Sequence, residues 1–177
     1  MSPDASSRTW PTTLDVDGVD PGVFRATLAR WASGVTVVTC ADASTSAPVG
    51  MTASSFSSLS LDPPLVLVCV AAAASAHDPL VGAEGFAVHI LSRDQADLSQ
   101  AFARPGTEKF DLVPDEHGPF DAPLLPLGAA RLACAHEAAL PGGDHTILVG
   151  RVVAAEHTHA AQLLYADRGY HGLDGSG

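Results

Sequence analysis

Two long apolar runs joined by a turn restrict the fold of this chain more than any other feature. Residues 128–140 and 145–157 are mostly apolar, and Pro-Gly-Gly-Asp stands between them at 141–144. Such a turn between two apolar runs predicts an antiparallel hairpin. Shorter β-type runs, separated by Pro, Gly and Ser clusters, precede it at 35–41, 48–56, 64–72 and 86–91. Strands that follow one another in this way predict an antiparallel barrel or sheet with appended helices, not a doubly wound parallel sheet.

Only a few segments have a helical pattern. A helix is expected to begin at Asp20, as N-cap, and to end at Gly34. Its apolar side is made by three residues, Phe24, Leu28 and Trp31. Further helices are expected at 77–83 and at 93–103, the second capped by Ser92.

The 177 residues suit one domain. Residues 1–19 are polar and aperiodic and are expected to form a flexible arm, residues 20–173 the domain, and residues 174–177 a loose tail. Within the domain, the five prolines of 104–127 predict a long ordered loop, and 162–172 a terminal hairpin.

Charge narrows the classes of partner. The formal net charge is −11, with nine basic and twenty acidic residues, so nucleic acid and anionic membranes are poor partners. A phosphate-bearing ligand would have to be held by local dipoles and hydroxyls against this field. Lys109 is the only lysine; it is either a partner for such a phosphate or a solvated loop charge.

Other broad features point to an ordinary globular protein. No apolar run reaches the ~18 residues of a membrane span, and the first 20 residues lack the apolar core of a signal peptide, so a cytoplasmic location is expected. Cys40, Cys69 and Cys134 lie far apart in strand-like segments and are expected to be buried small hydrophobes; neither a disulfide framework nor a metal site is expected.

A cluster of hydroxyl residues stands at the edge of the apolar core. The stretch GMTASSFSSLS, residues 50–60, holds five serines and a threonine without a charge. If it is a strand, alternation places Thr52, Ser54 and Phe56 on one face. Such hydroxyls can surround a phosphate with hydrogen bonds, although Ser/Thr clusters are also ordinary in turns and edge strands. Both interpretations stay open on this segment alone.

The wider pattern resembles the flavin reductase family, which are split-barrel, flavin-binding NAD(P)H:flavin oxidoreductases that supply two-component monooxygenases. The resemblance spans roughly residues 21–173 and is carried by several pieces in order: GVTVVTCADASTSAPVGMTASSFSSLSLDPPLVLVCV (34–70), FAVHILS (86–92), LSQAFA (98–103), EKF (108–110), LACAH (132–136), GDHTILVGRV (143–152) and LLYADRGYHGL (163–173). It implies a mainly β fold with appended helices, the FMN-binding split β-barrel.

The resemblance also implies a binding site. The stretch with Thr52, Ser54 and Ser55 would bind the phosphate end of the flavin, and the strand of Cys69, Val70 and Ala71 would run along its isoalloxazine or ribityl part. Further residues implied around the cofactor are Gly50, Met51, Ala53, Ser75, Ala101, Phe102, His145 and Tyr170, and Lys109 is added to the cofactor-binding candidates on its charge. His145 would lie near the nicotinamide and flavin rings, as the one candidate catalytic residue.

The implied reaction moves a hydride from C4 of NADH or NADPH to N5 of FMN or FAD, and needs orientation more than a protein nucleophile. Reduced flavin would then diffuse to a separate flavin-dependent monooxygenase, and the reductase would be a homodimer. His145 is otherwise a turn histidine with a local hydrogen bond. Two further hypotheses remain: a split-barrel protein that binds flavin without reducing it, and a reductase that keeps its flavin and reduces another acceptor.

Overall fold

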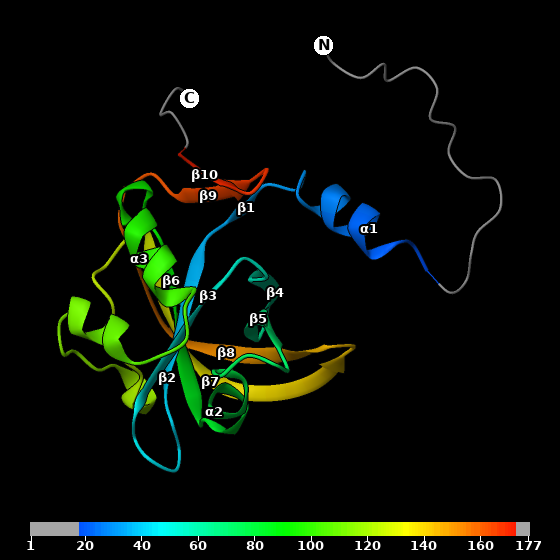
Figure 1. Ribbon diagram of the computed structural model, residues 1–177. Helices are drawn as coiled ribbons and strands as arrows, with labels where there is room; N and C mark the ends of the chain where they lie inside the picture. Colours follow the sequence, from blue (N-terminus) through cyan, green and yellow to red (C-terminus); the bar gives the residue numbers. More distant parts are fainter. Residues whose placement is uncertain (1–17, 173–177) are drawn as a thin grey trace, which may run out of the picture.

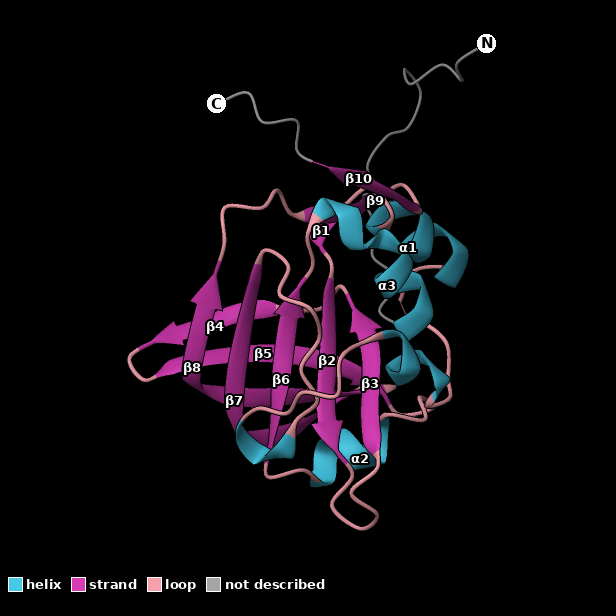
Figure 2. Cartoon of the chain, turned by 90° about the vertical axis from the view of Figure 1, so that its left-hand side faces the viewer, coloured by secondary structure: helices cyan, strands magenta, loops and turns pink. Residues whose placement is uncertain are grey.

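The strands of residues 18–172, the part of the chain that the computed structural model describes, form two antiparallel sheets. The large sheet runs in the order β3 (Pro48–Ala53), β2 (Thr36–Ala41), β6 (Gly85–Ile90), β7 (Ala130–Gly142), β8 (His145–His157), β5 (Pro64–Ala71) and β4 (Ser57–Leu61). The small sheet has the order β1 (Ser33–Gly34), β9 (Leu163–Ala166) and β10 (Gly169–Gly172). Figure 2 shows β4 and β5 crossing β6 and β2 at a large angle, so the large sheet curls into an open barrel.

The β7–β8 hairpin confirms the strongest sequence prediction. Pro141 pairs with Thr146 and Gly142 with His145, around Gly143 at φ +73°. A positive φ favours glycine, which explains the turn sequence. The expected terminal hairpin is also present as β9 and β10, and β9 pairs with β1 on its other side, at one end of the barrel (Figure 1).

Two apolar clusters fill the barrel. The larger one lies among the strands and includes Val38, Val68, Phe86, Val88 and Leu148. The smaller one lies under α3 (Ala96–Phe102) and is made by Val35, Val37, Leu91, Phe102, Leu125 and Leu163. The cysteines are free as expected; Cys40 and Cys134 are buried, and burial raises the pKa of both thiols to about 12, whereas Cys69 is half-buried.

The first helix begins where the sequence predicts but ends earlier. In α1 (Pro21–Leu28), the Asp20 carboxylate accepts hydrogen bonds from the backbone N–H groups of Gly22 (2.8 Å) and Val23 (3.0 Å). The predicted end at Gly34 is wrong, because Ser33 and Gly34 pair with β9 as strand β1. No residue of α1 is buried, and the helix points away from the barrel (Figure 1).

The other helices follow the prediction with local changes. α2 covers His77–Gly82. The expected helix at 93–103 is a 3₁₀ turn, η1 (Arg93–Gln95), followed by α3, and the Gln95 side chain accepts from the Ser92 backbone N–H at 3.0 Å. The expected ordered loop at 104–127 is present, and it contains two 3₁₀ turns that the sequence did not predict, η2 (Glu108–Leu112) and η3 (Pro119–Asp121). Short turns closed by bonds such as Phe110 N–H to the Thr107 carbonyl (2.9 Å) leave little periodic signal.

The predicted strand at 48–56 is also wrong at its end. β3 stops at Ala53, whose partner Thr36 is the first residue of β2, and β4 begins only at Ser57. Between them the Ser55 hydroxyl donates to the Cys69 carbonyl (2.9 Å) and accepts from the Cys69 N–H (3.0 Å). These two bonds turn the chain toward β5, so strict alternation does not extend through Ser54 and Phe56.

The expected arm and tail fall, apart from Gly18 and Val19, outside residues 18–172. Within those residues, no helix is both long and apolar enough to cross a membrane.

Candidate functional site

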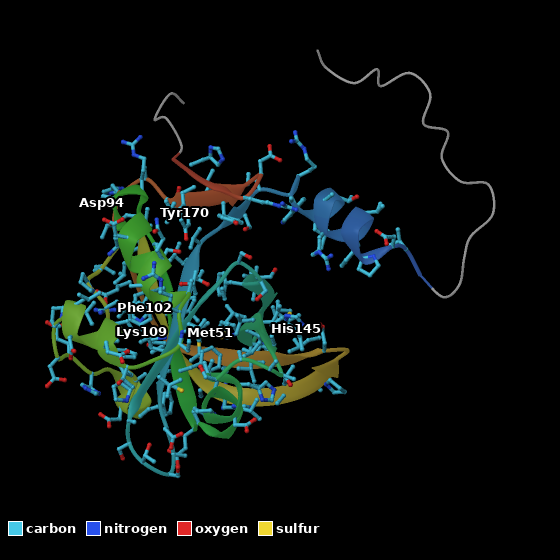
Figure 3. The ribbon with its side chains drawn as sticks, in the orientation of Figure 1. Met51, Asp94, Phe102, Lys109, His145 and Tyr170 are labelled. Atoms are coloured by element: carbon cyan, nitrogen blue, oxygen red, sulfur yellow. The ribbon has the colours of Figure 1, made fainter. Side chains whose placement is uncertain are left out.

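A cavity of about 360 Å³ lies where β3, the loop after β5 and the end of α3 meet. It is named here the basic pocket, and it is lined by Gly50, Met51, Thr52, Ala73, Ala74, Ser75, Ala76, Phe102, Ala103, Arg104, Pro105 and Lys109. Its two cations stand out in a chain of net charge −11. Figure 3 shows Lys109, Phe102 and Met51 gathered at this place.

Lys109 is held in the basic pocket by backbone carbonyls. Its Nζ donates to the carbonyls of Gly50 (2.7 Å) and Arg104 (2.8 Å) and lies 5.4 Å from the centre of the Phe102 ring. An ammonium group has three donors, so one N–H remains for a ligand. Partial burial lowers the pKa of Lys109, an effect partly opposed by the nearby Glu108 carboxylate. The group is therefore a fixed donor rather than a freely solvated loop charge.

Gly50 allows this close packing. A Cβ built at Gly50 would lie 2.8 Å from Phe102 Cε1 and 3.1 Å from Phe110 Cζ. The two rings pack edge to face, with centres 5.1 Å apart. The absence of a side chain at position 50 thus lets Phe102 close one wall of the basic pocket.

A second cavity, of about 260 Å³, adjoins the first. It is named here the tyrosine pocket, and it is lined by Val35, Thr52, Ser54, Ser99, Ala103, Tyr165 and Tyr170. Thr52 and Ala103 line both pockets. Tyr165 and Tyr170 meet edge to face with ring centres 5.5 Å apart, and none of the lining residues is charged. An uncharged, partly aromatic cavity suits a planar ring.

A chain of hydrogen bonds holds the tyrosine pocket together. The Thr52 hydroxyl donates to the Ser99 carbonyl at 2.6 Å, and the Ser99 hydroxyl bonds to the Tyr170 hydroxyl at 2.8 Å. Ser99 is fully buried. These bonds tie β3, α3 and β10 to one another, so the position of each element depends on the other two.

Not every hydroxyl of the 50–60 stretch is free to donate to a ligand. The Thr52 hydroxyl already donates to the Ser99 carbonyl, and the Ser55 hydroxyl already donates to the Cys69 carbonyl. Ser54 and Ser75 are exposed, and within residues 18–172 their hydroxyls have no hydrogen-bond partner. The idea that serine and threonine hydroxyls alone clasp a phosphate therefore has less support than the sequence suggests.

His145 lies apart from both pockets, beyond Met51 as seen from Lys109 (Figure 3). It begins β8 opposite Ala71, the last residue of β5. Its Nδ1 bonds to the Asp144 carboxylate at 2.7 Å, and this bond lowers the pKa of Asp144. The chain leads from Ala71 directly into the Ala73–Ala76 wall of the basic pocket.

The two pockets bring together only part of the predicted site. Of its residues, Gly50, Met51, Thr52, Ser54, Ser75, Phe102, Lys109 and Tyr170 line one or both pockets. Ala53 and Val70 are buried in the larger apolar cluster, and Ala101 packs on the smaller one. Ser55, Cys69, Ala71 and His145 line neither pocket.

Sequence reasoning did not identify three notable lining residues, Arg104, Ser99 and Tyr165. For Arg104 a signal was present, since it stands five residues from the only lysine of an acidic chain. Ser99 and Tyr165 carry no comparable pattern.

Other cavities of the described residues suit an anion less well. A larger one, of about 490 Å³, is lined by Asp111, Asp115 and Glu116, which would repel a phosphate. Another, of about 280 Å³, lies beside the Arg131–Glu156 ion pair, where the cation already has an acidic partner.

Comparison with known proteins identifies the family of the chain. The family model described as flavin reductase like domain matches residues 28–174. A probable flavin reductase of Rhizobium meliloti is 41% identical over 151 residues, or 85% of this chain, and the chain spans about half of that protein's length (48%).

Two solved structures have the same fold. The NADH:FAD oxidoreductase SgcE6 of Streptomyces globisporus, in complex with NAD and FAD fragments, is 36% identical with a TM-score of 0.82, covering 89% of this chain and 96% of its own. BorF, the flavin reductase component of a bacterial two-component tryptophan halogenase, is 38% identical with a TM-score of 0.78, covering 87% and 98%. The chain therefore belongs to the flavin reductase-like family, and its open, mainly β barrel is the split barrel of these proteins.

Proposed function

We propose that this protein is an NAD(P)H-dependent flavin reductase that transfers a hydride from reduced nicotinamide to FMN or FAD. The observation that carries the proposal is the pair of pockets joined at Thr52 and Ala103, one cationic and one aromatic and uncharged. A flavin nucleotide has the same division between a phosphate end and a planar ring. Relatives named as flavin reductases support the same activity.

The residues present fit such a ligand. Lys109, Arg104 and Ser75 offer donors for a phosphate in the basic pocket. Tyr165 and Tyr170 offer apolar area for a ring in the tyrosine pocket. This arrangement moves the proposed phosphate contact from Ser55, whose hydroxyl is already bonded, toward Lys109.

The two nucleotides supply the hydride chemistry between nicotinamide C4 and flavin N5 when they are bound. The protein's part is to bind and orient: Lys109 anchors one end, and the Thr52–Ser99–Tyr170 chain fixes the wall that the ring would meet. Neither of the two cations, Lys109 and Arg104, is fully buried, so the phosphate would be bound without a desolvated charge pair. Moderate binding of this kind suits a flavin that must leave after reduction.

His145 is proposed to act at the nicotinamide end. Its side chain is 42% exposed, and its Nδ1 bond to Asp144 leaves Nε2 free to face a ligand. Its backbone neighbour across the sheet, Ala71, belongs to the strand that leads into the basic pocket.

We also propose that two copies associate and that a separate flavin-dependent oxygenase receives the reduced flavin by diffusion. The apolar residues Val23, Phe24, Leu28 and Trp31 of the α1 region are 51–76% exposed, and a second copy would cover them. BorF, the flavin reductase component of a two-component tryptophan halogenase, supports a separate partner enzyme that uses the reduced flavin. Sedimentation should give a dimer, and Leu28→Asp should shift it toward monomer. The cytoplasmic location stays a prediction.

The test of the proposed activity is NADH and NADPH oxidation, followed at 340 nm, with FMN, FAD or riboflavin added in turn. Oxidation that depends on added flavin is expected. Flavin binding without oxidation would instead identify a non-catalytic binding protein, and a yellow protein after gel filtration would favour a tightly bound flavin. His145→Ala should lower turnover at saturating flavin; unchanged turnover would remove it from the mechanism.

A further inference from the structure

Arg104 stands at the rim of the basic pocket. It follows Ala103, the C-cap residue of α3, and its side chain is exposed. Its own carbonyl accepts a hydrogen bond from Lys109 Nζ at 2.8 Å. The backbone position of Arg104 is therefore fixed relative to the inner cation.

The guanidinium of Arg104 has no partner among residues 18–172. Three other arginines are paired within the protein: Arg30 with Asp167, Arg131 with Glu156 and Arg151 with Glu137. Arg25 and Arg168 also have no side-chain partner within residues 18–172, but they line neither pocket. Arg104 forms neither an ion pair nor a side-chain hydrogen bond within the described residues. In a chain with twenty acidic residues, an arginine that lines a cavity with its five donors unused is available to an anionic ligand.

The two cations differ in depth and in donor number. Lys109 is half-buried and has one donor left after its bonds to Gly50 and Arg104. That single donor serves one phosphate group. Arg104, farther out, offers a planar fork that can bind a second phosphate in bidentate fashion.

We propose that Arg104 makes the protein prefer a flavin with a diphosphate, FAD, over the monophosphate FMN. The proposal rests on the proposed flavin-reductase function, with the first phosphate at Lys109. The second phosphate of the dinucleotide then lies at the rim, against the Arg104 guanidinium. The same position is empty of phosphate when FMN binds.

The test is equilibrium titration of the oxidised flavins against the purified full chain, followed by flavin fluorescence, with FAD, FMN and riboflavin as probes. Arg104→Gln should weaken FAD binding about tenfold and FMN binding by less than about twofold. Arg104→Lys should recover part of the FAD affinity, because it keeps the charge but loses the fork. Arg151→Gln is the matched control, since it removes one positive charge outside both pockets.

Salt gives a second readout that a structural role would not move. The ratio of FAD to FMN affinity should fall with ionic strength in the wild type and should be nearly flat in Arg104→Gln, because an exposed charge is screened. If Arg104→Gln keeps the wild-type unfolding temperature and loses FAD and FMN affinity equally, the ratio of the two affinities is unchanged. That result would overturn the proposed role of Arg104. Wild-type protein that oxidises no NADH or NADPH with any flavin would overturn the proposed function instead, so the two failures are distinct.

Discussion

The basic pocket and the tyrosine pocket share a wall at Thr52 and Ala103 but hold their polar groups in different ways. In the basic pocket, backbone carbonyls of Gly50 and Arg104 fix the Lys109 ammonium and leave one donor over. In the tyrosine pocket, the protein's own groups bond to one another through Thr52 and Ser99.

This contrast indicates where an acidic chain of this kind can hold an anion. The cationic donors that remain unsatisfied lie on the basic side, whereas on the aromatic side Thr52, Ser99 and Tyr170 bond to one another and the hydroxyls left over carry no charge. A ligand with one charged end and one planar end is therefore expected to bind in a single orientation.

Loss of the Lys109 charge should have the largest effect. Lys109→Met keeps the apolar stem over Phe102 but removes the charge, and we expect FMN affinity to fall about 10- to 100-fold, as for a charge-assisted hydrogen bond. Riboflavin, which lacks the phosphate, is the control and should bind nearly as before. Equal losses for FMN and riboflavin in a folded variant would show that the two pockets do not divide the ligand in this way.

Adding a side chain at Gly50, in the wall of the basic pocket, should have the second-largest effect. In Gly50→Ala the new Cβ would approach the Phe102 ring to 2.8 Å, so overpacking should lower the free energy of unfolding by about 1–3 kcal/mol. Gly82→Ala is the matched control, because a Cβ there meets nothing within 4 Å. Denaturant unfolding of both variants measures the difference. If they are equally stable, Gly50 does not set the position of Phe102.

Alkaline pH should weaken phosphate binding in the basic pocket alone. Burial lowers the pKa of Lys109 below the usual 10.5, and only the protonated form carries the charge. FMN affinity should therefore decrease as the pH rises, and the decrease should begin at a pH below 10.5. Above the pKa of Lys109 in the flavin-free protein, the affinity should fall by up to about tenfold per pH unit. Titrations of FMN and riboflavin across this range measure it. Lys109→Arg should remove the fall, and a fall of the same size with riboflavin would argue against Lys109.

Breaking the bond chain of the tyrosine pocket should have the smallest effect. Tyr170→Phe removes the partner of the buried Ser99 hydroxyl, and we expect a loss of about 1 kcal/mol in unfolding free energy. Tyr165→Phe is the control, because within residues 18–172 its hydroxyl has no hydrogen-bond partner; its change should stay below about 0.5 kcal/mol. Thermal unfolding of the two variants decides between them, and the opposite ranking would contradict the bond chain.

Much of the fold could be predicted because its signals are local. The β7–β8 hairpin follows from a glycine-containing turn between two apolar runs, and the start of α1 follows from Asp20 before Pro21. The 3₁₀ turns at Glu108–Leu112 and Pro119–Asp121 were missed because one turn of helix has too few residues to show a period.

The site could be predicted only in part because its contacts join distant segments. Ser99 and Tyr170 are 71 positions apart, and Lys109 and Gly50 are 59 apart. Pattern along the chain says nothing about such pairs. Lys109 was still a candidate through its rarity, whereas Tyr165 and Ser99 had nothing to distinguish them.

The mainly β architecture, the turn at 141–144 and the family of the chain can be recognised from sequence alone, since each depends on short motifs or on their order. Which hydroxyls and cations stay available to a ligand depends on the folded arrangement. The hydroxyls of Ser55 and Thr52 donate to backbone carbonyls that folding places beside them. Arg104 lines the same pocket as Lys109, and its guanidinium donates to no residue of 18–172. A side chain's chemistry is set by its residue type, but its freedom to bind a ligand depends on which partners folding places within hydrogen-bond distance.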